Sequence, residues 1–335
     1  MTKPTIQDIA RLSGVSTATV SRAIHEPRLL LPETLRRVRE AMEEHGYVYN
    51  AVAGDLSRRK SSVLGLFLPT TESPKISTTS IALQDVANSH GFPVIINNTL
   101  FDPRLERDLL RQCRERSLAG LIFVGCMMEN EEAIFGLGGE MPCLFLWDSL
   151  AETDCNYIGI DNFAASREMG GYLLGLGHRR IAFVGALPMQ VRRIHKRLEG
   201  FLNAMREGGG HTPDEYVLEY APTLENGRLA MRRLLALASP PTAVFCACDT
   251  LAIGALTACR EAGLSVPCDI SIAGFDDMDF ASHAFPPLTT VRVPAREMGD
   301  AAGHAMLAML RTDGATSVRR VLPTSIIVRE TCAPI

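Results

Sequence analysis

The sequence of 335 residues lacks the features of membrane and secreted proteins. It has no apolar run of the roughly 18 residues that a helix needs to cross a bilayer. Charged and polar residues interrupt positions 1 to 22, where a leader peptide would carry its apolar segment. We therefore expect a cytoplasmic protein that makes no contact with a membrane.

Cysteine pairs with the spacing of a metal site are also missing. The nine cysteines are scattered along the chain, and their odd number does not suit a disulfide framework. Cys246 and Cys248 alternate within one apolar run, and no second pair matches them. We expect reduced thiols, as in a cytoplasm, and no bound metal.

The motifs of common enzyme classes are absent as well. The sequence contains no GxGxxG after a strand, no GxxxxGK[ST], no GxSxG and no HExxH. Its eight histidines are dispersed, and His178 in "LGHRR" is interpreted as a helix-end residue before a strand. Polar residues at strand ends then indicate ligand binding without turnover, so we expect no catalytic residue and no cofactor.

Charge is divided unevenly along the chain. The first 60 residues carry ten Lys and Arg against seven Asp and Glu, a net charge of +3, whereas the whole chain has −4. The remaining residues therefore carry −7. A small basic unit on a large acidic body suggests that the first 60 residues meet a polyanion.

Three short helices are predicted near the N-terminus. "TIQDIARLSGVSTATVSRAI" (5–24) has two helix starts, at Thr5 and Ser16, with Gly14 at the turn between them. "PETLRRVREAMEEHGY" opens a third helix with Pro32. Three short helices with so small a core are typical of a helix-turn-helix module.

The first turn of the second helix carries short side chains, most of them with a hydroxyl group, which suits a recognition helix. Such a helix enters the major groove with its N-terminus first, so its first turn meets phosphates and base edges. Hydroxyls suit phosphate oxygens, short side chains reach base edges, and arginine pairs with guanine. A purely structural capping role for Ser16 and Thr19 is the alternative. The predicted DNA contacts of this module are Thr5, Ser16, Thr17, Ala18, Thr19, Ser21 and Arg22.

The chain resembles the LacI/GalR family of bacterial transcription regulators from about Thr5 to Thr331. The resemblance rests on "TIQDIARLSGVSTATVSRAI", "GYVYN", "LGHRRIAFVG", "RLEGF", "CDTLAIGAL", "VPCDISIAGFDD" and "PPLTTVRVP". It implies a fold class in which a small all-α helix-turn-helix domain precedes an α/β bilobed body. That body would be like the periplasmic binding proteins, with two doubly wound parallel sheets. The resemblance also implies a homodimer, a pseudo-palindromic operator DNA and a small effector. No leucine heptad follows Thr331, which favours a dimer over a tetramer.

Residues 61 to 335 alternate between strand-like and helical segments, a pattern typical of parallel sheets covered by helices. Short apolar runs such as "LAGLIFVG", "RRIAFVG" and "AVFCACD" alternate with helical stretches, and ligands bind at the carboxyl ends of such strands. The expected domains are 1–49 (helix-turn-helix), 50–60 (hinge helix) and 61–335 (effector binding and dimerisation). Lobe 1 would hold about 61–161 and 292–320, and lobe 2 about 162–291 and 321–331.

The hinge segment "NAVAGDLSRRKS" is expected to form a short helix capped by Asn50. The resemblance implies that this helix orders on DNA and that Leu56 pries open a minor-groove step; Ala53 is counted with it as a DNA contact. Gly54 departs from the family, which usually has a polar or basic residue there. A plain flexible linker is the alternative.

Effector contacts are predicted at strand ends and in one basic cluster. The resemblance implies that Arg197, just ahead of a helix, and Asp276 hold the ligand, because an arginine fork and a carboxylate together recognise paired hydroxyls. Asp249 could equally cap the next helix, and Trp147 could equally be core. The cluster "QVRRIHKR" favours a sugar acid over a neutral sugar, unless its arginines are merely solvated. The full predicted set is Thr71, Ser73, Lys75, Trp147, Asp161, Arg193, Lys196, Arg197, Cys248, Asp249 and Asp276.

We therefore expect a DNA-binding regulator, most simply a repressor of a carbohydrate or sugar-acid operon. A transport-type solute-binding protein and a doubly wound enzyme are the alternatives. The first lacks its leader peptide here and would not carry a helix-turn-helix module, and the second lacks phosphate loops and a clustered acid/base pair.

Overall fold

The computed structural model describes residues 4–25, 27–49, 61–186, 191–312 and 314–335. Contacts divide the chain into two compact units, Met1–Ser61 and Ser62–Ile335. Among the described residues, no helix is long and apolar enough to cross a membrane.

The N-terminal unit is a bundle of three helices around a very small core. Its helices are α1 (Ile6–Ser13), α2 (Thr17–His25) and α3 (Pro32–Glu44). Ile9, Val20 and Val38, one from each helix, are fully buried against one another. Gly14 ends α1 with φ +65°, a left-handed conformation that glycine adopts without strain, and so turns the chain into α2.

The larger unit contains two six-stranded sheets, each forming one lobe. The sheet of lobe 1 has the order β11-β5-β4-β3-β1-β2, and that of lobe 2 the order β12-β10-β9-β8-β6-β7. All pairs are parallel except β10 with β12, which are antiparallel. The strands of lobe 1 are β1 (Leu64–Leu68), β2 (Val94–Asn98), β3 (Gly120–Val124), β4 (Cys143–Leu146), β5 (Tyr157–Gly159) and β11 (Arg319–Val321). The strands of lobe 2 are β6 (Ile181–Ala186), β7 (Val217–Tyr220), β8 (Ala243–Cys246), β9 (Ser271–Asp276), β10 (Thr289–Arg292) and β12 (Ser325–Ile327).

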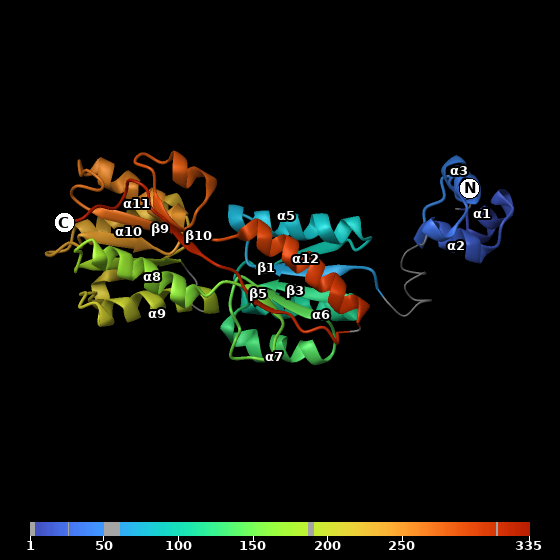
Figure 1. The fold of residues 1–335 in the computed structure, drawn as a ribbon, viewed down its shortest axis with the longest axis horizontal. Helices are drawn as coiled ribbons and strands as arrows, with labels where there is room; N and C mark the ends of the chain where they lie inside the picture. The colour runs from blue at the N-terminus through green and yellow to red at the C-terminus, as the bar shows by residue number, and fades with distance from the viewer. Residues whose placement is uncertain (1–3, 26, 50–60, 187–190, 313) are drawn as a thin grey trace. The chain divides into compact units, whose positions relative to one another are not determined.

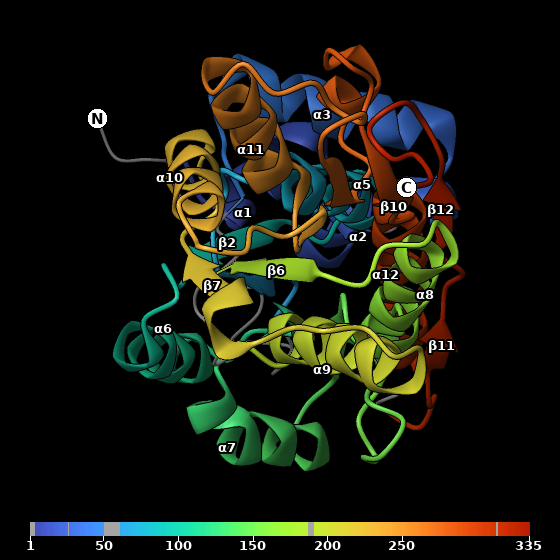
Figure 2. The ribbon, with the colours of Figure 1, turned by 90° about the vertical axis from the view of Figure 1, so that its left-hand side faces the viewer.

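Helices cover both faces of each sheet, because the crossover connections between parallel strands place helices there. In lobe 1, α5 and α12 pack together, and α6 and α7 lie away from them (Figure 1). In lobe 2, α8 packs on α9 and α10 on α11, with β6 between the two pairs (Figure 2). These helices are α5 (Pro74–Ser89), α6 (Pro103–Glu115), α7 (Glu131–Gly136), α8 (Asn162–Gly175), α9 (Arg192–Glu207), α10 (Leu224–Leu235), α11 (Asp249–Glu261) and α12 (Ala295–Arg311).

The expected fold class, an all-α module followed by two parallel α/β lobes, is confirmed. One local expectation was wrong: Arg197 lies within α9, in its second turn, and not ahead of a helix. The chain passes between the lobes after β5, after β10 and after β11, so each lobe is assembled from separate stretches of sequence.

Candidate functional site

The N-terminal turn of α2 presents a polar face. The Ser16 hydroxyl accepts a hydrogen bond from the Thr19 amide (3.2 Å), so it caps the helix start, and it lies 2.9 Å from the Thr19 hydroxyl. Val20 and Ala23 are buried on the opposite face. Of the predicted DNA contacts, Ser16, Thr17, Ala18 and Arg22 are exposed, and Thr19 and Ser21 are half-buried.

Thr5 begins α1 with a capping box. Its hydroxyl accepts from the Asp8 amide (3.3 Å), while the Asp8 carboxylate accepts from the Thr5 amide (2.9 Å). The Thr5 side chain is exposed, as a DNA contact requires. The other predicted DNA contacts, Asn50, Ala53 and Leu56, lie outside the described residues.

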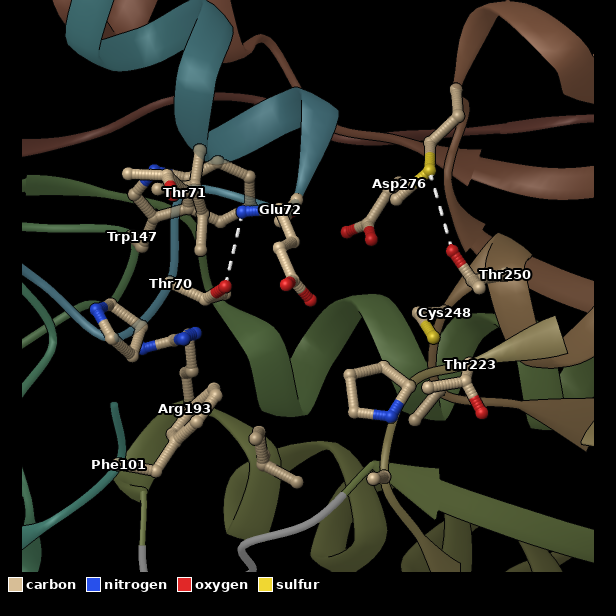
Figure 3. A pocket seen from close by; sticks show the side chains of 18 of the residues that line it. Thr70, Thr71, Glu72, Phe101, Trp147, Arg193, Thr223, Cys248, Thr250 and Asp276 are labelled. Carbon is tan, nitrogen blue, oxygen red and sulfur yellow. Dashed lines mark hydrogen bonds between the residues drawn. The ribbon is translucent and has the colours of Figure 1, made fainter. Parts of the chain in front are cut away.

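A cavity of about 560 Å³ lies between the two lobes. Lobe 1 contributes the loops after β1, β2 and β4, and lobe 2 contributes the start of α9 and the ends of β8 and β9. These are the carboxyl ends of parallel strands, where open α/β sheets bind their ligands. In Figure 3, Arg193 and Asp276 point into this space from different sides, and the Glu72 side chain hangs between them.

Arg197 is the most heavily bonded cation in the wall of the cavity. Its guanidinium donates to Asn162 Oδ1 (2.9 Å) and to the Ala247 carbonyl (2.8 Å). The same group lies 3.6 Å from the centre of the Phe275 ring, in cation–π contact. These contacts hold Arg197 rigidly against the end of β8.

Asp276 forms an ion pair with this arginine at the end of β9. Its Oδ1 lies 3.7 Å from Arg197 Nη2, and both side chains are almost completely buried. Burial raises the pKa of Asp276 to about 6, although the positive charge of Arg197 opposes that rise. Oδ1 has no hydrogen-bond partner among the described residues. A buried acceptor without a donor favours a ligand hydroxyl at this place.

Arg193 reaches across from lobe 2 to lobe 1. Its Nη1 donates to the Val124 carbonyl at the end of β3 (3.2 Å), and only 6% of the residue is exposed. Burial, and then the nearby charge of Arg197, lower the pKa of Arg193 to about 10, so the group remains charged at neutral pH.

Comparison with known proteins agrees with both halves of this architecture. Residues 5–50 match the family of bacterial regulatory proteins called lacI, and residues 171–332 match the periplasmic-binding-protein-like domain. The chain is 31% identical over 328 residues to the transcriptional repressor CytR of Escherichia coli K12, covering 98% of this chain and 96% of the relative. It is 34% identical to the repressor PurR of Serratia proteamaculans, covering 90% and 89%. The chain belongs to the LacI family.

Solved structures of transcriptional regulators superpose on the chain. The Lac repressor dimer bound to operator and the anti-inducer ONPF matches with a TM-score of 0.86 at 26% identity, covering 99% of this chain and 100% of that one. A complex of the regulator CelR with cellobiose matches with a TM-score of 0.72 at 26% identity, covering 98% and 99%. The named relatives are transcriptional regulators.

Seven of the predicted effector contacts of this LacI-family chain line the cavity. They are Thr71, Ser73, Trp147, Arg193, Arg197, Cys248 and Asp276. Burial raises the pKa of the Cys248 thiol to about 12, so this side chain is a neutral and weakly polar part of the wall.

Two predicted effector contacts are used as structural groups outside the cavity wall. Asp161 is exposed and caps α8 by accepting from the Ala164 amide (2.9 Å). Asp249 is fully buried behind the wall, where its carboxylate accepts from the Met278 amide (2.7 Å) and the Thr290 hydroxyl (2.5 Å). Asp249 therefore neither caps α11 nor reaches the cavity.

The two predicted lysines do not line the cavity either. Lys196 Nζ donates to the Ser149 carbonyl (2.9 Å) and pairs with Glu152 (3.3 Å) on lobe 1. Lys75 lies in the first turn of α5, from which its charge lowers the pKa of Asp276 without an ion pair.

Several wall residues were missed by reasoning from sequence. Asn98 ends β2, so the rule that ligands bind at strand carboxyl ends could have found it. Glu72 and Phe101 lie in loops whose conformation the sequence pattern does not specify. The missed polar and aromatic wall residues are Thr70, Glu72, Asn98, Phe101, Thr223 and Thr250.

Proposed function

We propose that this protein is a dimeric transcriptional repressor whose affinity for operator DNA is controlled by a small polyhydroxylated ligand. The observation that carries the proposal is the Arg197–Asp276 ion pair buried in the wall of the cavity. A carboxylate that accepts from hydroxyls beside a fixed guanidinium that donates back is suited to a sugar or a sugar acid.

The N-terminal unit supplies DNA binding in this proposal. We assign residues 1–49 to the DNA-binding domain, 50–60 to the hinge and 61–335 to effector binding and dimerisation. The exposed polar start of α2 would enter the major groove, and the protein would work in the bacterial cytoplasm, where free thiols and DNA coexist.

A mobility-shift assay on the region upstream of the protein's own gene tests the proposal. We expect sequence-specific binding whose affinity falls steeply with salt. Each neutralised phosphate releases counterions and contributes about −0.9 to the slope of log K against log salt concentration. Arg22→Ala should weaken specific binding by about 1–3 kcal/mol and relax base preference, since arginine reads guanine. Failure to bind DNA specifically, or affinity unchanged between about 50 and 200 mM salt, would refute the assignment.

Dimerisation is proposed to use the edge of the lobe 1 sheet. β2 is the edge strand, and Ile95 and Ile96 on it are 38% and 41% exposed, with Ile81 of α5 54% exposed. Large exposed apolar side chains at a sheet edge suit contact with a second copy of this chain.

A further inference from the structure

We infer that the ligand is a polyhydroxylated carboxylic acid and that Arg193 binds its carboxylate. This inference rests on the proposed function and narrows the ligand class at the same site. Four cations lie in the first two turns of α9, and they differ in how far other groups neutralise them: Arg192, Arg193, Lys196 and Arg197.

Two of these cations are already neutralised by lobe 1. Arg192 pairs with Glu131 of α7 (2.6 Å) and with Glu152 (2.5 Å). Lys196 pairs with the same Glu152 and donates to a backbone carbonyl. Both side chains are therefore occupied in joining the lobes and leave little positive potential for a ligand.

The third cation, Arg197, is neutralised by Asp276. Its Nε and Nη1 are taken by an amide oxygen and a backbone carbonyl, and its face is covered by the Phe275 ring. Arg197 with Asp276 thus forms a neutral pair that suits hydroxyl groups better than an extra negative charge.

Arg193 differs from the other three. The only hydrogen bond that the described residues give its guanidinium is the one to the Val124 carbonyl, and they place no carboxylate within ion-pair distance. A guanidinium has five N–H donors, so most of this group's capacity remains for a ligand. The charges of Asp148 and Asp276 raise the pKa of Arg193, but neither carboxylate forms an ion pair with it. A buried cation without an ion-pair partner is costly, and an anion bound beside it offsets that cost.

The backbone of lobe 1 is shaped around this guanidinium. Gly125 follows β3 with φ +71°, and a Cβ atom on it would lie 2.2 Å from Arg193 Nη1. Glycine adopts this conformation without strain, and a side chain at this position would displace the end of the Arg193 guanidinium. The free charge is thus held where both lobes meet, so an anion bound to it contacts both of them.

Apart from Asp276, which Arg197 neutralises, Glu72 is the only carboxylate that the described residues place in the cavity wall, and its charge opposes the binding of an anion. Glu72 lines the mouth, but it is exposed, so water and salt screen its charge more than that of the buried arginine. Glu72→Gln removes the repulsion that remains, so it should strengthen the binding of an acid more than that of the matching neutral sugar.

The test uses the full-length protein and a panel of aldonates with their matching neutral sugars, such as D-gluconate with D-glucose. Binding is measured by thermal shift and then by calorimetry. We expect at least one aldonate to bind about tenfold or more tightly than its neutral partner, a ratio equivalent to about 1.4 kcal/mol. Arg193→Met should remove that preference, and Arg193→Lys should restore part of it. The matched control Arg206→Met, an exposed arginine in the same helix, should change nothing.

Three outcomes overturn the inference: binding of neutral sugars alone, binding of no aldonate in the panel, or an acid preference that survives in Arg193→Met. If Arg193→Met does not fold, an undiminished acid preference in Arg193→Gln overturns the inference in the same way. Operator binding by each variant is measured in parallel. If the wild type binds operator but shows no acid preference, the inference fails and the proposed repressor function remains. If the wild type does not bind operator, the proposed function fails.

Discussion

At the scale of single residues, Asp276 is the proposed ligand contact that a substitution tests most directly. Asp276→Asn keeps the shape of the side chain but removes the counterion of buried Arg197. We expect ligand affinity to fall by about thirtyfold or more, because breaking a buried charge-assisted contact costs about 2–5 kcal/mol. Calorimetry measures the loss, and a mobility-shift assay without ligand should show unchanged operator binding. Full ligand response in this variant would show that Asp276 is not a ligand contact.

We expect Asp249 to make the stability of the larger unit depend on pH. Burial, and then the charge of Asp276, raise the pKa of Asp249 to about 8 from its usual 3.8. The folded state therefore binds this proton more tightly than the unfolded state. The contribution of Asp249 to stability is fully present below about pH 4 and is lost as the pH rises through about 8.

Asp249→Asn should flatten this dependence. Between pH 5 and pH 8 the free energy of unfolding of the wild type should fall by a few kcal/mol more than that of the variant, since each unit of pKa is worth about 1.4 kcal/mol. Urea denaturation at the two pH values measures it. Asp279→Asn serves as the control, because Asp279 is exposed whereas Asp249 is buried. If the free energy of unfolding depends on pH identically in Asp249→Asn and in the wild type, the pKa of Asp249 is not raised in the folded state.

At the scale of elements, close helix crossings hold lobe 2 together and position α9. A Cβ atom on Gly200 of α9 would lie 2.1 Å from the Phe163 carbonyl of α8. Gly200→Ala must therefore push the two helices apart, which we expect to cost about 1–3 kcal/mol. Thermal denaturation measures this cost, and ligand affinity should fall with it because α9 carries Arg193 and Arg197.

Gly171→Ala in α8 is the matched control for this crossing. Nothing lies within 4 Å of a Cβ atom at Gly171, so alanine adds only helix propensity there. This substitution should raise stability by up to about 1 kcal/mol. Equal effects of the two substitutions would show that the close approach of α8 and α9 contributes nothing.

At the scale of the whole molecule, we expect assembly and DNA binding to be coupled. Two recognition helices must reach two half-sites of a pseudo-palindromic operator, so a monomer should bind it weakly. Ile96→Glu places a charge on the exposed edge strand β2 without disturbing the core of lobe 1. We expect sedimentation to show monomers and operator affinity to drop by at least about tenfold, or 1.4 kcal/mol. Ile96→Val should remain dimeric, and a dimeric Ile96→Glu variant would place the interface elsewhere.

The sequence alone was sufficient for the organisation of the chain. The capped starts of α1 and α2, with Gly14 between them, predict the helix-turn-helix module because caps and turns are local signals. Apolar runs bounded by Gly, Pro and Asp predict the parallel strands for the same reason. Asp276, directly after an apolar run, could be placed at a strand end without knowledge of the tertiary structure.

The tertiary structure alone decided which polar groups are free to bind a ligand. Arg192 and Lys196, four residues apart on α9, face carboxylates of lobe 1, whereas Arg193 and Arg197, also four apart, face the cavity. The sequence lists these cations side by side, but the carboxylates that neutralise them come from distant segments. The Asp249 carboxylate likewise accepts a hydrogen bond from Thr290, 41 residues away, and so lies behind the cavity wall. Local sequence specifies where a helix or strand begins, whereas the partner of a buried charge depends on how separate segments pack.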